Sequence, residues 1–440
     1  MLERHPCPGR TLWEEAIKQD GVVYADTSVA DGGTISYWVE NAYYQVTERD
    51  TEDLAAACNE LTAMLIQAGD HIIAEKLFDR LGIPPFAVPA IVRSWADDDP
   101  TGYHPSVYGR MDLRWGNDPA LLARDPTLAH PKLLEYNADT PTCLPESTGA
   151  QWNWLLLNPT VRGDQWNNAF EALVAAWRRN LELLGKRRNR KVETVHFVHT
   201  AAEASGEDRM NTALVAAAAE QAGYRVKMQY IEDIRLETLN ESYAMLDADT
   251  LAPMGSFLDS DGEPMRVVFK LYPWEWMLEE PFGKTALWSL QQSGGTVWVE
   301  PPYKLMWSNK GILPVLWELF RDDPVRSRYL LPAYFEGDEP AGFRDNCVRK
   351  PLFGREGGNV AVLRDGEVVV HNGGGYGAEG YVLQEFAELP VFEGIGGPFH
   401  ALTGVWMIDN EAAGLCFRES KGPITDNMSF FVPHVIKGLG

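Results

Sequence analysis

The spacing of hydrophobic and polar residues alternates along the chain between a period typical of helices and one typical of strands. Apolar residues three and four positions apart predict helices that bury one face, and these lie at residues 51–68, 71–80, 88–95, 147–157, 167–184, 207–221 and 312–320. Short runs rich in β-branched and aromatic residues predict strands, which lie at 35–39, 42–46, 107–113, 132–137, 192–199, 224–231, 265–271, 296–300, 361–370, 381–386 and 401–417. The chain is therefore expected to be an α/β protein with α+β elements.

The first two predicted helices meet at a glycine. Thr51 is a candidate N-cap for the first of them, because Glu52 and Asp53 follow in its first turn. Gly69 is a typical residue at a helix end, and a second helix is expected over 71–80. This segment is thus predicted as two helices.

Residues 192–231 have a β-α-β order, which predicts a small parallel α/β subdomain. The first strand is followed by an Ala-rich helix, by Gly223 as a stop signal and by a second strand. No GxGxxG motif follows the first strand, so dinucleotide binding is not expected. His196 and His199 are three positions apart and face opposite sides of a strand, which argues against a shared metal.

Two predicted strands each carry polar residues two positions apart, on one face. Arg110 and Asp112 share a face of the strand at 107–113, and Glu135 and Asn137 share a face of the strand at 132–137. If these strands are neighbours, two carboxylates and an amide could hold Mg2+, and the arginine could neutralise phosphoryl charge. The alternative is an ordinary cross-strand ion pair between Arg110 and Glu135, beside a strand end with a turn-forming asparagine.

A glycine-rich loop follows a strand that carries Lys350. Gly354, Gly357 and Gly358 would let backbone N–H groups approach phosphate oxygens closely, and a lysine adds a point charge. The loop is not a Walker A motif, because GxxxxGK[ST] is absent. A plain flexible loop is an equally valid interpretation of this stretch alone. The hairpin that follows has an Asp365–Gly366 turn.

Composition limits the classes of partner. The chain has 440 residues, of which 45% are hydrophobic, and a formal net charge of −24. This charge disfavours nucleic acid and anionic membranes as partners. It is compatible with a cationic substrate such as a polyamine, although it could serve solubility alone. A basic run at 186–191 is expected to be a solvated connection between a helix and a strand.

Cysteine usage and hydropathy indicate the compartment. The five cysteines include no CxxC pair, which fits a reducing environment rather than a disulfide framework. The sequence has no apolar leader at its start and no apolar run of about 18 residues. A cytoplasmic location is therefore expected.

Seven motifs occur in an order that resembles the glutathionylspermidine synthetase family and, more narrowly, its stand-alone acid–amine ligases. The motifs are YGRMD, LLEYNADTPT, FKLYPWEWM, SNKGILPVLWEL, RKPLFGREGGNV, YVLQEF and FRES…FVPH. The resemblance spans residues 95–440 and, more weakly, the rest. It implies an ATP-grasp fold with a pre-ATP-grasp α/β subdomain, and an ATP- and Mg2+-dependent ligase that forms an amide through an acyl phosphate.

The resemblance also implies roles for individual residues. Arg110 would stabilise the transition state of phosphoryl transfer, and Thr140 and Thr142 would contact the substrate. The implied ATP-binding residues are Arg110, Met111, Asp112, Lys310, Lys350, Gly357, Gln384 and Arg418. The implied metal ligands are Asp112, Glu135 and Asn137. Glu275 and Asp426 are candidate acidic partners for a cationic amine.

The expected organisation has three parts. Residues 1–100 would form helices and strands packed on the body, residues 101–270 the pre-ATP-grasp part with the metal-site strands, and residues 271–440 the nucleotide-binding lobes. The expected substrates are a small carboxylic acid or peptide and an amine or polyamine. The amidase segment of the bifunctional members is not recognised here, so hydrolase activity is not expected. Two alternatives remain, namely a nucleotide-binding protein that hydrolyses ATP without ligation and a non-catalytic scaffold.

Overall fold

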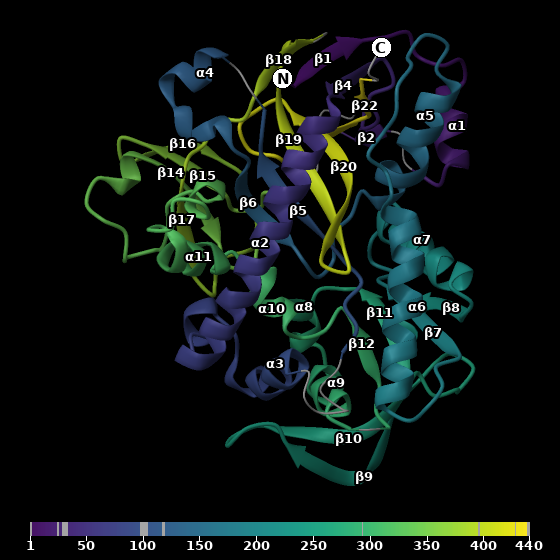
Figure 1. Cartoon of the computed structure of the whole chain (residues 1–440). Coiled ribbons are helices and arrows are strands. Elements are labelled where there is room, and N and C mark those ends of the chain that lie inside the picture. Colours follow the sequence, from purple (N-terminus) through teal and green to yellow (C-terminus); the bar gives the residue numbers. More distant parts are fainter. Residues whose placement is uncertain are drawn as a thin grey trace.

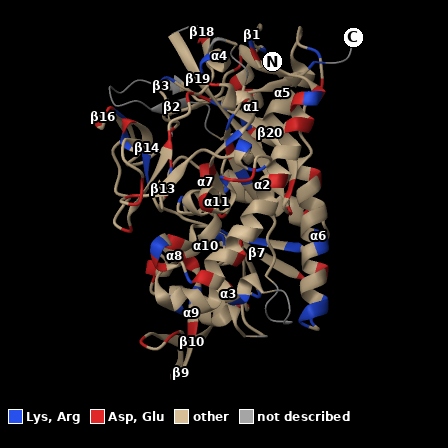
Figure 2. Cartoon of the chain, turned by 60° about the vertical axis from the view of Figure 1, so that its left-hand side comes forward, with Lys and Arg blue, Asp and Glu red and all other residues tan. Residues whose placement is uncertain are grey.

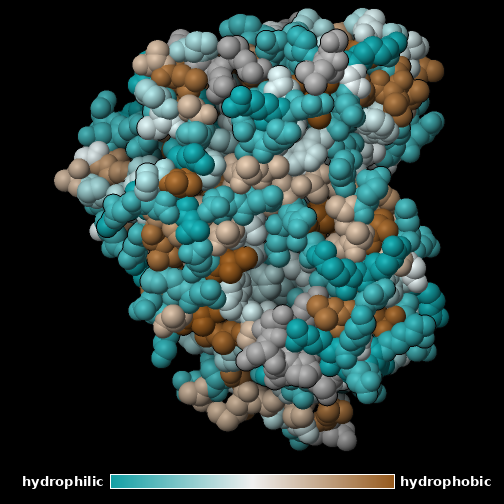
Figure 3. Space-filling model, in the orientation of Figure 1, coloured by the Kyte–Doolittle hydropathy of each residue, from teal (hydrophilic) through white to brown (hydrophobic). Residues whose placement is uncertain are grey.

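In the computed structural model of the chain, the described residues form three larger sheets, three small sheets of two or three strands, and the helices that pack on them (Figure 1). The structure describes residues 2–23, 26–28, 34–96, 104–116, 119–292, 294–394, 397–426 and 428–437. Figure 3 shows a face that is mostly hydrophilic, with hydrophobic residues in small separate groups.

The central sheet is antiparallel and has the order β21-β20-β19-β5-β6, with β18 paired to β19. Its strands are β5 (Tyr108–Arg114), β6 (Lys132–Asn137), β18 (Val391–Gly394), β19 (Gly397–Ile408), β20 (Glu411–Ser420) and β21 (Phe430–Val432). The two strands expected to carry the metal site are therefore neighbours, as predicted. Short helices α4 (Pro119–Arg124) and η3 (Pro126–Ala129) lie in the connection between them.

A long helix, α2 (Glu48–Glu75), packs on β19 and β20 and runs across the front of the central sheet in Figure 1. The prediction of two helices was wrong here. Thr47, not Thr51, is the N-cap, and its side chain and that of Asp50 form a capping box. Gly69 does not end the helix, which continues to Glu75. A Cβ at position 69 would lie 2.4 Å from the Trp95 ring. This glycine instead allows α3 (Val88–Trp95) to approach closely.

A parallel sheet of order β12-β11-β7-β8 forms a second layer. Its strands are β7 (Thr194–His199), β8 (Arg225–Tyr230), β11 (Val267–Leu271) and β12 (Val297–Val299). Helix α7 (Glu207–Gln221) connects β7 to the parallel β8, so the β-α-β prediction is confirmed. Helix α6 (Ala169–Arg187) packs beside α7. An antiparallel ribbon of β9 (Arg235–Met245) and β10 (Leu251–Leu258), which the sequence did not predict, extends below it in Figure 1.

A second antiparallel sheet, of order β13-β17-β14-β15-β16, packs against α11 (Ile312–Phe320). Its strands are β13 (Ala333–Phe335), β14 (Asn346–Pro351), β15 (Ala361–Arg364), β16 (Glu367–His371) and β17 (Tyr381–Glu385). The β15–β16 hairpin turns at Asp365 and Gly366, whose φ angles are 49° and 79°. Two successive positive φ angles fit the predicted Asp-Gly hairpin turn.

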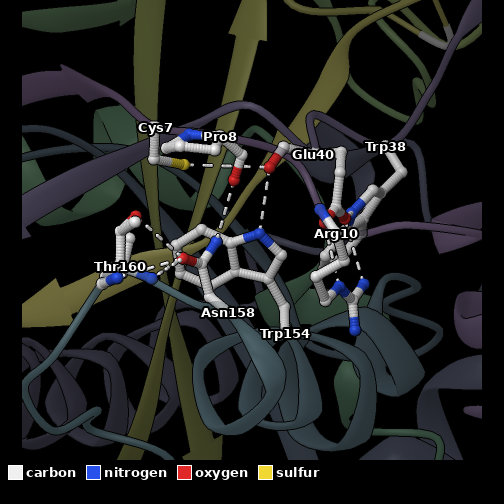
Figure 4. A network of polar contacts seen from close by, with 9 residues as sticks. Cys7, Pro8, Arg10, Trp38, Glu40, Trp154, Asn158 and Thr160 are labelled. Atoms are coloured by element: carbon white, nitrogen blue, oxygen red, sulfur yellow. Dashed lines mark hydrogen bonds and ion pairs between the residues drawn. The ribbon is translucent and has the colours of Figure 1, made fainter.

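The buried carboxylate of Glu40 holds parts of the N-terminal segment together (Figure 4). Its Oε1 accepts from Arg10 Nε at 2.9 Å, and its Oε2 accepts from Trp38 Nε1 at 2.9 Å. The Glu40 carbonyl accepts from Trp154 Nε1 at 3.0 Å. A small sheet completes this end, with β1 (Glu3–Pro6), β4 (Ala42–Val46) and β22 (His434–Ile436).

The remaining elements are short. They are α1 (Trp13–Gln19), β2 (Asp26–Ser28), β3 (Thr34–Ser36), η1 (Asp79–Leu81), η2 (Pro85–Ala87), η4 (Glu146–Ala150), α5 (Gln151–Leu157), η5 (Ile231–Asp233), α8 (Trp274–Glu279), α9 (Gly283–Leu290), α10 (Lys304–Trp307), η6 (Ser327–Tyr329) and η7 (Phe343–Asp345). Because β5 and β6 share a sheet with β18–β21, strands from the second and third expected parts pack together. The division of the chain at residues 100 and 270 stays a prediction.

Candidate active site

The register between β5 and β6 brings four polar side chains together. Arg110 lies opposite Asn137, and Asp112 lies opposite Glu135. The adjacent strand β19 makes room for the arginine, because a Cβ at Gly404 would lie 3.1 Å from Arg110 Cδ. The cluster predicted from the i, i+2 spacing therefore forms.

The hydrogen bonds among these side chains do not match the alternative interpretation, which was a cross-strand ion pair between Arg110 and Glu135. Arg110 pairs with Asp112 of its own strand, with Nε 2.7 Å from Oδ1 and Nη2 3.0 Å from Oδ2. Asn137 Nδ2 lies 3.1 Å from Asp112 Oδ2 and 3.4 Å from Glu135 Oε1. Glu135 instead forms an ion pair with Lys310, at 3.0 Å, so the simple Arg110–Glu135 pair does not form.

Both lysines predicted to bind phosphate lie at this cluster. Lys310 Nζ donates to the Gly354 carbonyl at 2.7 Å, which connects Glu135 to the glycine-rich loop. Lys350 Nζ donates to the Leu134 carbonyl at 2.9 Å and to Gln384 Oε1 at 2.7 Å. Each lysine thus has one carboxylate or amide oxygen as a partner and stands beside β6.

Burial and charge shift the pKa values in this cluster. Burial alone would raise the pKa of Glu135, but Lys310 and Lys350 lower it to about 2. Burial lowers the pKa of Lys350 to about 8, although Glu135 opposes this shift. Burial also acts against the charge of Arg110, yet Asp112 raises its pKa well above the ordinary value. At neutral pH the cluster therefore holds paired opposite charges, with the Glu135 side chain still 31% exposed to the cavity.

A cavity opens between the central sheet and the second antiparallel sheet. Six of the predicted residues line it, namely Asp112, Glu135, Lys310, Lys350, Gly357 and Gln384. Apolar side chains line the remainder, including Val348, Val362 and Leu402. A polar end beside an apolar end suits a ligand with a charged tail and a flat ring. The side chain of Met111 is not in this group, because it lies in the hydrophobic core.

The glycine-rich loop covers one side of the cavity. Gly357 has a φ of 66°, and a Cβ there would lie 2.7 Å from the Thr425 carbonyl oxygen. Because only glycine fits both the backbone angle and this contact, the loop can lie directly against residues 423–425. The loop is therefore packed against a neighbouring segment, unlike the plain flexible loop that was the alternative.

Arg418 and Asp426 lie at the far side of the cluster, on β20 and the loop after it. Arg418 Nη2 donates to the Asp426 carbonyl at 2.8 Å, and its Nε has no hydrogen-bond partner among the described residues. The carboxylate of Asp426 accepts from the Met428 backbone at 2.9 Å. This carboxylate therefore serves a local turn in the structure.

Arg355, a loop residue that sequence reasoning missed, joins two of the predicted substrate residues. Its Nη2 lies 2.8 Å from Glu275 Oε1, and its Nη1 donates to Thr140 Oγ1 at 2.6 Å. Burial acts against its charge, but Glu275 raises its pKa. The glycine-rich loop is thereby tied to α8 and to the turn after β6. In the sequence, only the position of Arg355 between Gly354 and Gly357 pointed to it.

Thr142 connects the phosphate-side cluster to a group of acidic residues at the start of α7. Its carbonyl accepts from Arg110 Nη1 at 2.5 Å, and its hydroxyl bonds to Glu207. Burial raises the pKa of Glu207, and burial together with Glu207 and Glu203 raises that of Asp208 to about 7. Sequence reasoning missed this group, because acidic residues in a first helical turn are ordinary.

The described residues contain no group of three His, Cys, Asp or Glu side chains arranged for a metal ion. The candidate metal set consists of two carboxylates and the amide of Asn137. Asparagine is not one of those four residue types, so this set is a different kind of site. Carboxylate and amide oxygens are nevertheless ligands that Mg2+ accepts. The chemistry of the set thus agrees with Mg2+ rather than with a softer metal.

The chain belongs to the glutathionylspermidine synthase preATP-grasp family, whose model matches residues 4–437. A Haemophilus influenzae protein named "Putative acid--amine ligase" is 28% identical over 434 residues, with 97% of each chain covered. The trypanothione synthetase of Crithidia fasciculata is 27% identical, and the bifunctional glutathionylspermidine synthetase/amidase of Escherichia coli is 24% identical. These two matches cover 75% and 90% of this chain, but 47% and 59% of those enzymes.

The fold comparison agrees with the family. A glutathione synthetase-like effector from Globodera pallida aligns with 97% of this chain and 96% of its own, with a TM-score of 0.54 and 10% sequence identity. The predicted family and the predicted ATP-grasp fold are therefore confirmed. The relatives identify the chain as an ATP-dependent ligase that joins an acid and an amine through an amide bond. ATP-grasp ligases generally use ATP and Mg2+. Among the described residues, no helix is long and apolar enough to cross a membrane.

Proposed function

We propose that the chain joins a small carboxylic acid or peptide to a cationic amine, at the expense of ATP and through an acyl phosphate. The observation that carries this proposal is the register of β5 and β6, which sets Arg110 and Asp112 against Asn137 and Glu135. A charge-neutralising arginine beside two carboxylates and an amide has the composition of a phosphoryl-transfer site.

ATP is proposed to bind in the cavity between the two antiparallel sheets. Its adenine would lie against the apolar side chains near Gln384, and its phosphates toward Lys310 and Lys350. The ammonium groups would exchange their present partners for phosphate oxygens. Gly357 would let the loop backbone approach the phosphates, and Arg418 retains an unpaired Nε among the described residues. Met111 could contribute only its backbone, because its side chain is in the core.

Asp112, Glu135 and Asn137 are proposed to hold Mg2+. The fit rests on Asn137, whose Nδ2 donates to both carboxylates and so stands where a cation would neutralise them. Turning this amide by half a rotation presents Oδ1 instead, which completes a set of three hard oxygen ligands. When bound, Mg2+ supplies neutralisation of phosphate charge and orientation of the phosphate chain.

Arg110 is proposed as the catalytic residue of the first step. An oxygen of the substrate carboxylate attacks the γ-phosphorus, the bond to the β-phosphate oxygen breaks, and ADP leaves with that electron pair. Arg110 is held by Asp112 and by the Thr142 carbonyl, so its guanidinium meets the developing charge without rearrangement. The amine nitrogen then attacks the acyl carbon and loses a proton, and phosphate leaves.

The acidic residues beside Thr142 support a cationic amine as the second substrate. Glu207 and Asp208 lie at the start of α7, and burial raises the pKa of each, with a further contribution from neighbouring acidic residues that include Glu203. An ammonium group would relieve the repulsion among these carboxylates. These residues are better placed for it than Asp426, whose carboxylate serves a local turn, while Glu275 is paired with Arg355. The relatives whose names contain glutathionylspermidine make a polyamine a reasonable first candidate.

A product screen tests the proposal. The chain is incubated with ATP, Mg2+ and pooled acids and amines, and products are identified by mass spectrometry. The expected result is ADP, phosphate and a new mass equal to an acid plus an amine minus water. ADP without a condensation product would support the non-ligating ATPase, and absence of nucleotide binding would support the scaffold.

A further inference from the structure

A second cleft lies at the opposite edge of the parallel sheet from the candidate active site. It is formed where β7, β8, β11 and β12 begin, beside the C-terminal end of α6, and it encloses about 820 Å3. Six basic residues line it, namely Arg188, Arg190, Lys191, Arg225, Lys227 and Arg266. Figure 2 shows Lys and Arg residues gathered at this end of α6. Such a concentration stands out in a chain whose net charge is −24.

Two of these arginines have buried N–H groups without partners. Among the described residues, Arg188 Nε and Nη2 and Arg266 Nε have no hydrogen-bond acceptor. Arg188 Nη1 donates to the Gln292 carbonyl at 3.3 Å, and Arg266 Nη1 donates to the Gly294 carbonyl. A buried donor left unpaired is energetically unfavourable. Guanidinium groups in this state indicate a site for an acceptor-rich ligand.

The electrostatics of the two arginines agree with this interpretation. Burial, with a contribution from the neighbouring Arg93, lowers the pKa of Arg188 to about 10. Burial and Arg190 lower the pKa of Arg266. Both shifts mean that the surroundings disfavour the positive charge, which a bound anion would stabilise.

Three carboxylates, those of Glu193, Glu220 and Glu263, also line the cleft and neutralise part of its charge. Glu193 lies 3.6 Å from both Lys191 and Arg225, and Lys227 pairs with Asp259 and Asp261. In the part of the chain that the structure describes, no carboxylate lies within ion-pair distance of the other three basic residues, Arg188, Arg190 and Arg266. These three are thus available to an external anion.

The size and charge of the cleft restrict the ligand. Its volume falls within the range of small-molecule sites, and the strongly negative chain around it repels a long polyanion such as nucleic acid. Guanidinium groups bind phosphate oxygens through paired N–H donors. We propose that this cleft binds a small free molecule with two or more adjacent phosphate groups, held by Arg188, Arg190 and Arg266. The proposal goes beyond the ligase activity, whose residues lie at the other edge of the sheet.

Inorganic tripolyphosphate, titrated calorimetrically without Mg2+, tests the site. The Lys310→Gln/Lys350→Gln double variant is the starting protein, because those lysines offer a second phosphate site. Adding Arg188→Gln and Arg266→Gln should weaken binding by at least about tenfold, since each substitution removes charged hydrogen bonds to phosphate oxygens. Neither substitution removes an ion pair, so thermal unfolding should show that the variant remains folded.

A charge-matched variant provides the control. Arg49→Gln and Arg124→Gln remove two positive charges at side chains that are 87% and 68% exposed, on α2 and α4. Tripolyphosphate binding should then change by less than about twofold. Equal losses in both double variants, or none in the cleft variant, would overturn the proposal. Tighter binding of a hexaglutamate peptide than of tripolyphosphate would also overturn it in favour of an acidic protein segment.

Discussion

Asp112 lies directly opposite Glu135 across the β5–β6 ladder, and one amide, Nδ2 of Asn137, donates to both carboxylates. Two negative groups so close together need a positive charge or donors between them. Arg110 and Lys310 supply charge from either side, which leaves the amide position as the one that a cation would take.

Asp112→Asn should lower the rate of ATP cleavage by at least about 10²–10³-fold. Asparagine lacks the negative charge that would bind Mg2+ and that pairs with Arg110. The measurement is ADP formation at saturating ATP and Mg2+. Asparagine keeps the shape and one acceptor, so the loss should exceed any loss of folded protein seen by circular dichroism. Asp338→Asn, which changes a carboxylate paired with Arg80 on the surface, should have nearly normal activity. A nearly normal rate in Asp112→Asn would remove the metal assignment.

Gly404→Ala should disable the site without removing a charged group. The new Cβ would lie 2.5 Å from Cys416 Sγ and 3.1 Å from Arg110 Cδ, so the arginine must move. A displacement of this kind should lower kcat by about 10²-fold, and overpacking should destabilise the fold by about 1–3 kcal/mol.

The neighbouring strand offers a matched control for that glycine. At Gly414 of β20, the nearest atom to a new Cβ would be 3.5 Å away, which is ordinary contact. Gly414→Ala should therefore retain both stability and ATP cleavage, as measured by thermal unfolding and initial rates. Equal effects at the two positions would show that Arg110 is not held through Gly404.

The core of the site could be predicted because its geometry is local. Side chains at i and i+2 of a strand share a face, so each of the pairs Arg110/Asp112 and Glu135/Asn137 followed from the sequence. Their apposition needed only that the strands be neighbours. The sequence did not show which carboxylate pairs with Arg110. Lys310, from a distant segment of the chain, forms the ion pair with Glu135.

The missed features depend on contacts between distant parts of the chain. Gly69 looked like a helix end, but the tertiary contact with Trp95 gives it another role inside α2. Glu207 looked like an ordinary residue of a first helical turn, and only folding brings it to Thr142. Arg355 reaches Glu275 only when the glycine-rich loop closes on α8.

Lys350 should make ATP binding sensitive to pH. Burial lowers its pKa to about 8 in the free protein, so its positive charge is present below that pH and is lost above it. If binding requires the charged form, the KM for ATP should rise up to about tenfold per pH unit above 8. Lys350→Met should raise the KM at pH 7 and make the profile flat in this range. An unchanged profile in the variant would assign the ionisation to another group.

Asp208 should set the opposite dependence for the amine. Burial and its acidic neighbours raise its pKa to about 7, so the carboxylate is charged above that pH and neutral below it. The KM for a cationic amine should therefore fall by up to about tenfold between pH 6 and 8. Asp208→Asn should remove this dependence, whereas Glu237→Gln on the exposed β9–β10 ribbon should keep it. Persistence of the dependence in Asp208→Asn would contradict the assignment.

Arg355 should couple ATP cleavage to amide formation. Its guanidinium holds the glycine-rich loop to Glu275 and Thr140. In the proposed reaction, this closure would keep water from the activated acyl group. Arg355→Gln loses charged hydrogen bonds worth about 1.5–3 kcal/mol each, enough to shift the closed population about tenfold. ADP should still form, but the amide formed per ADP should fall several-fold, as measured by mass spectrometry and a coupled ADP assay. Arg364→Gln is the control, because that arginine bonds to Asn346 at the end of β15. A ratio of amide to ADP that stays at the parent value in Arg355→Gln would show that the loop closes without this residue.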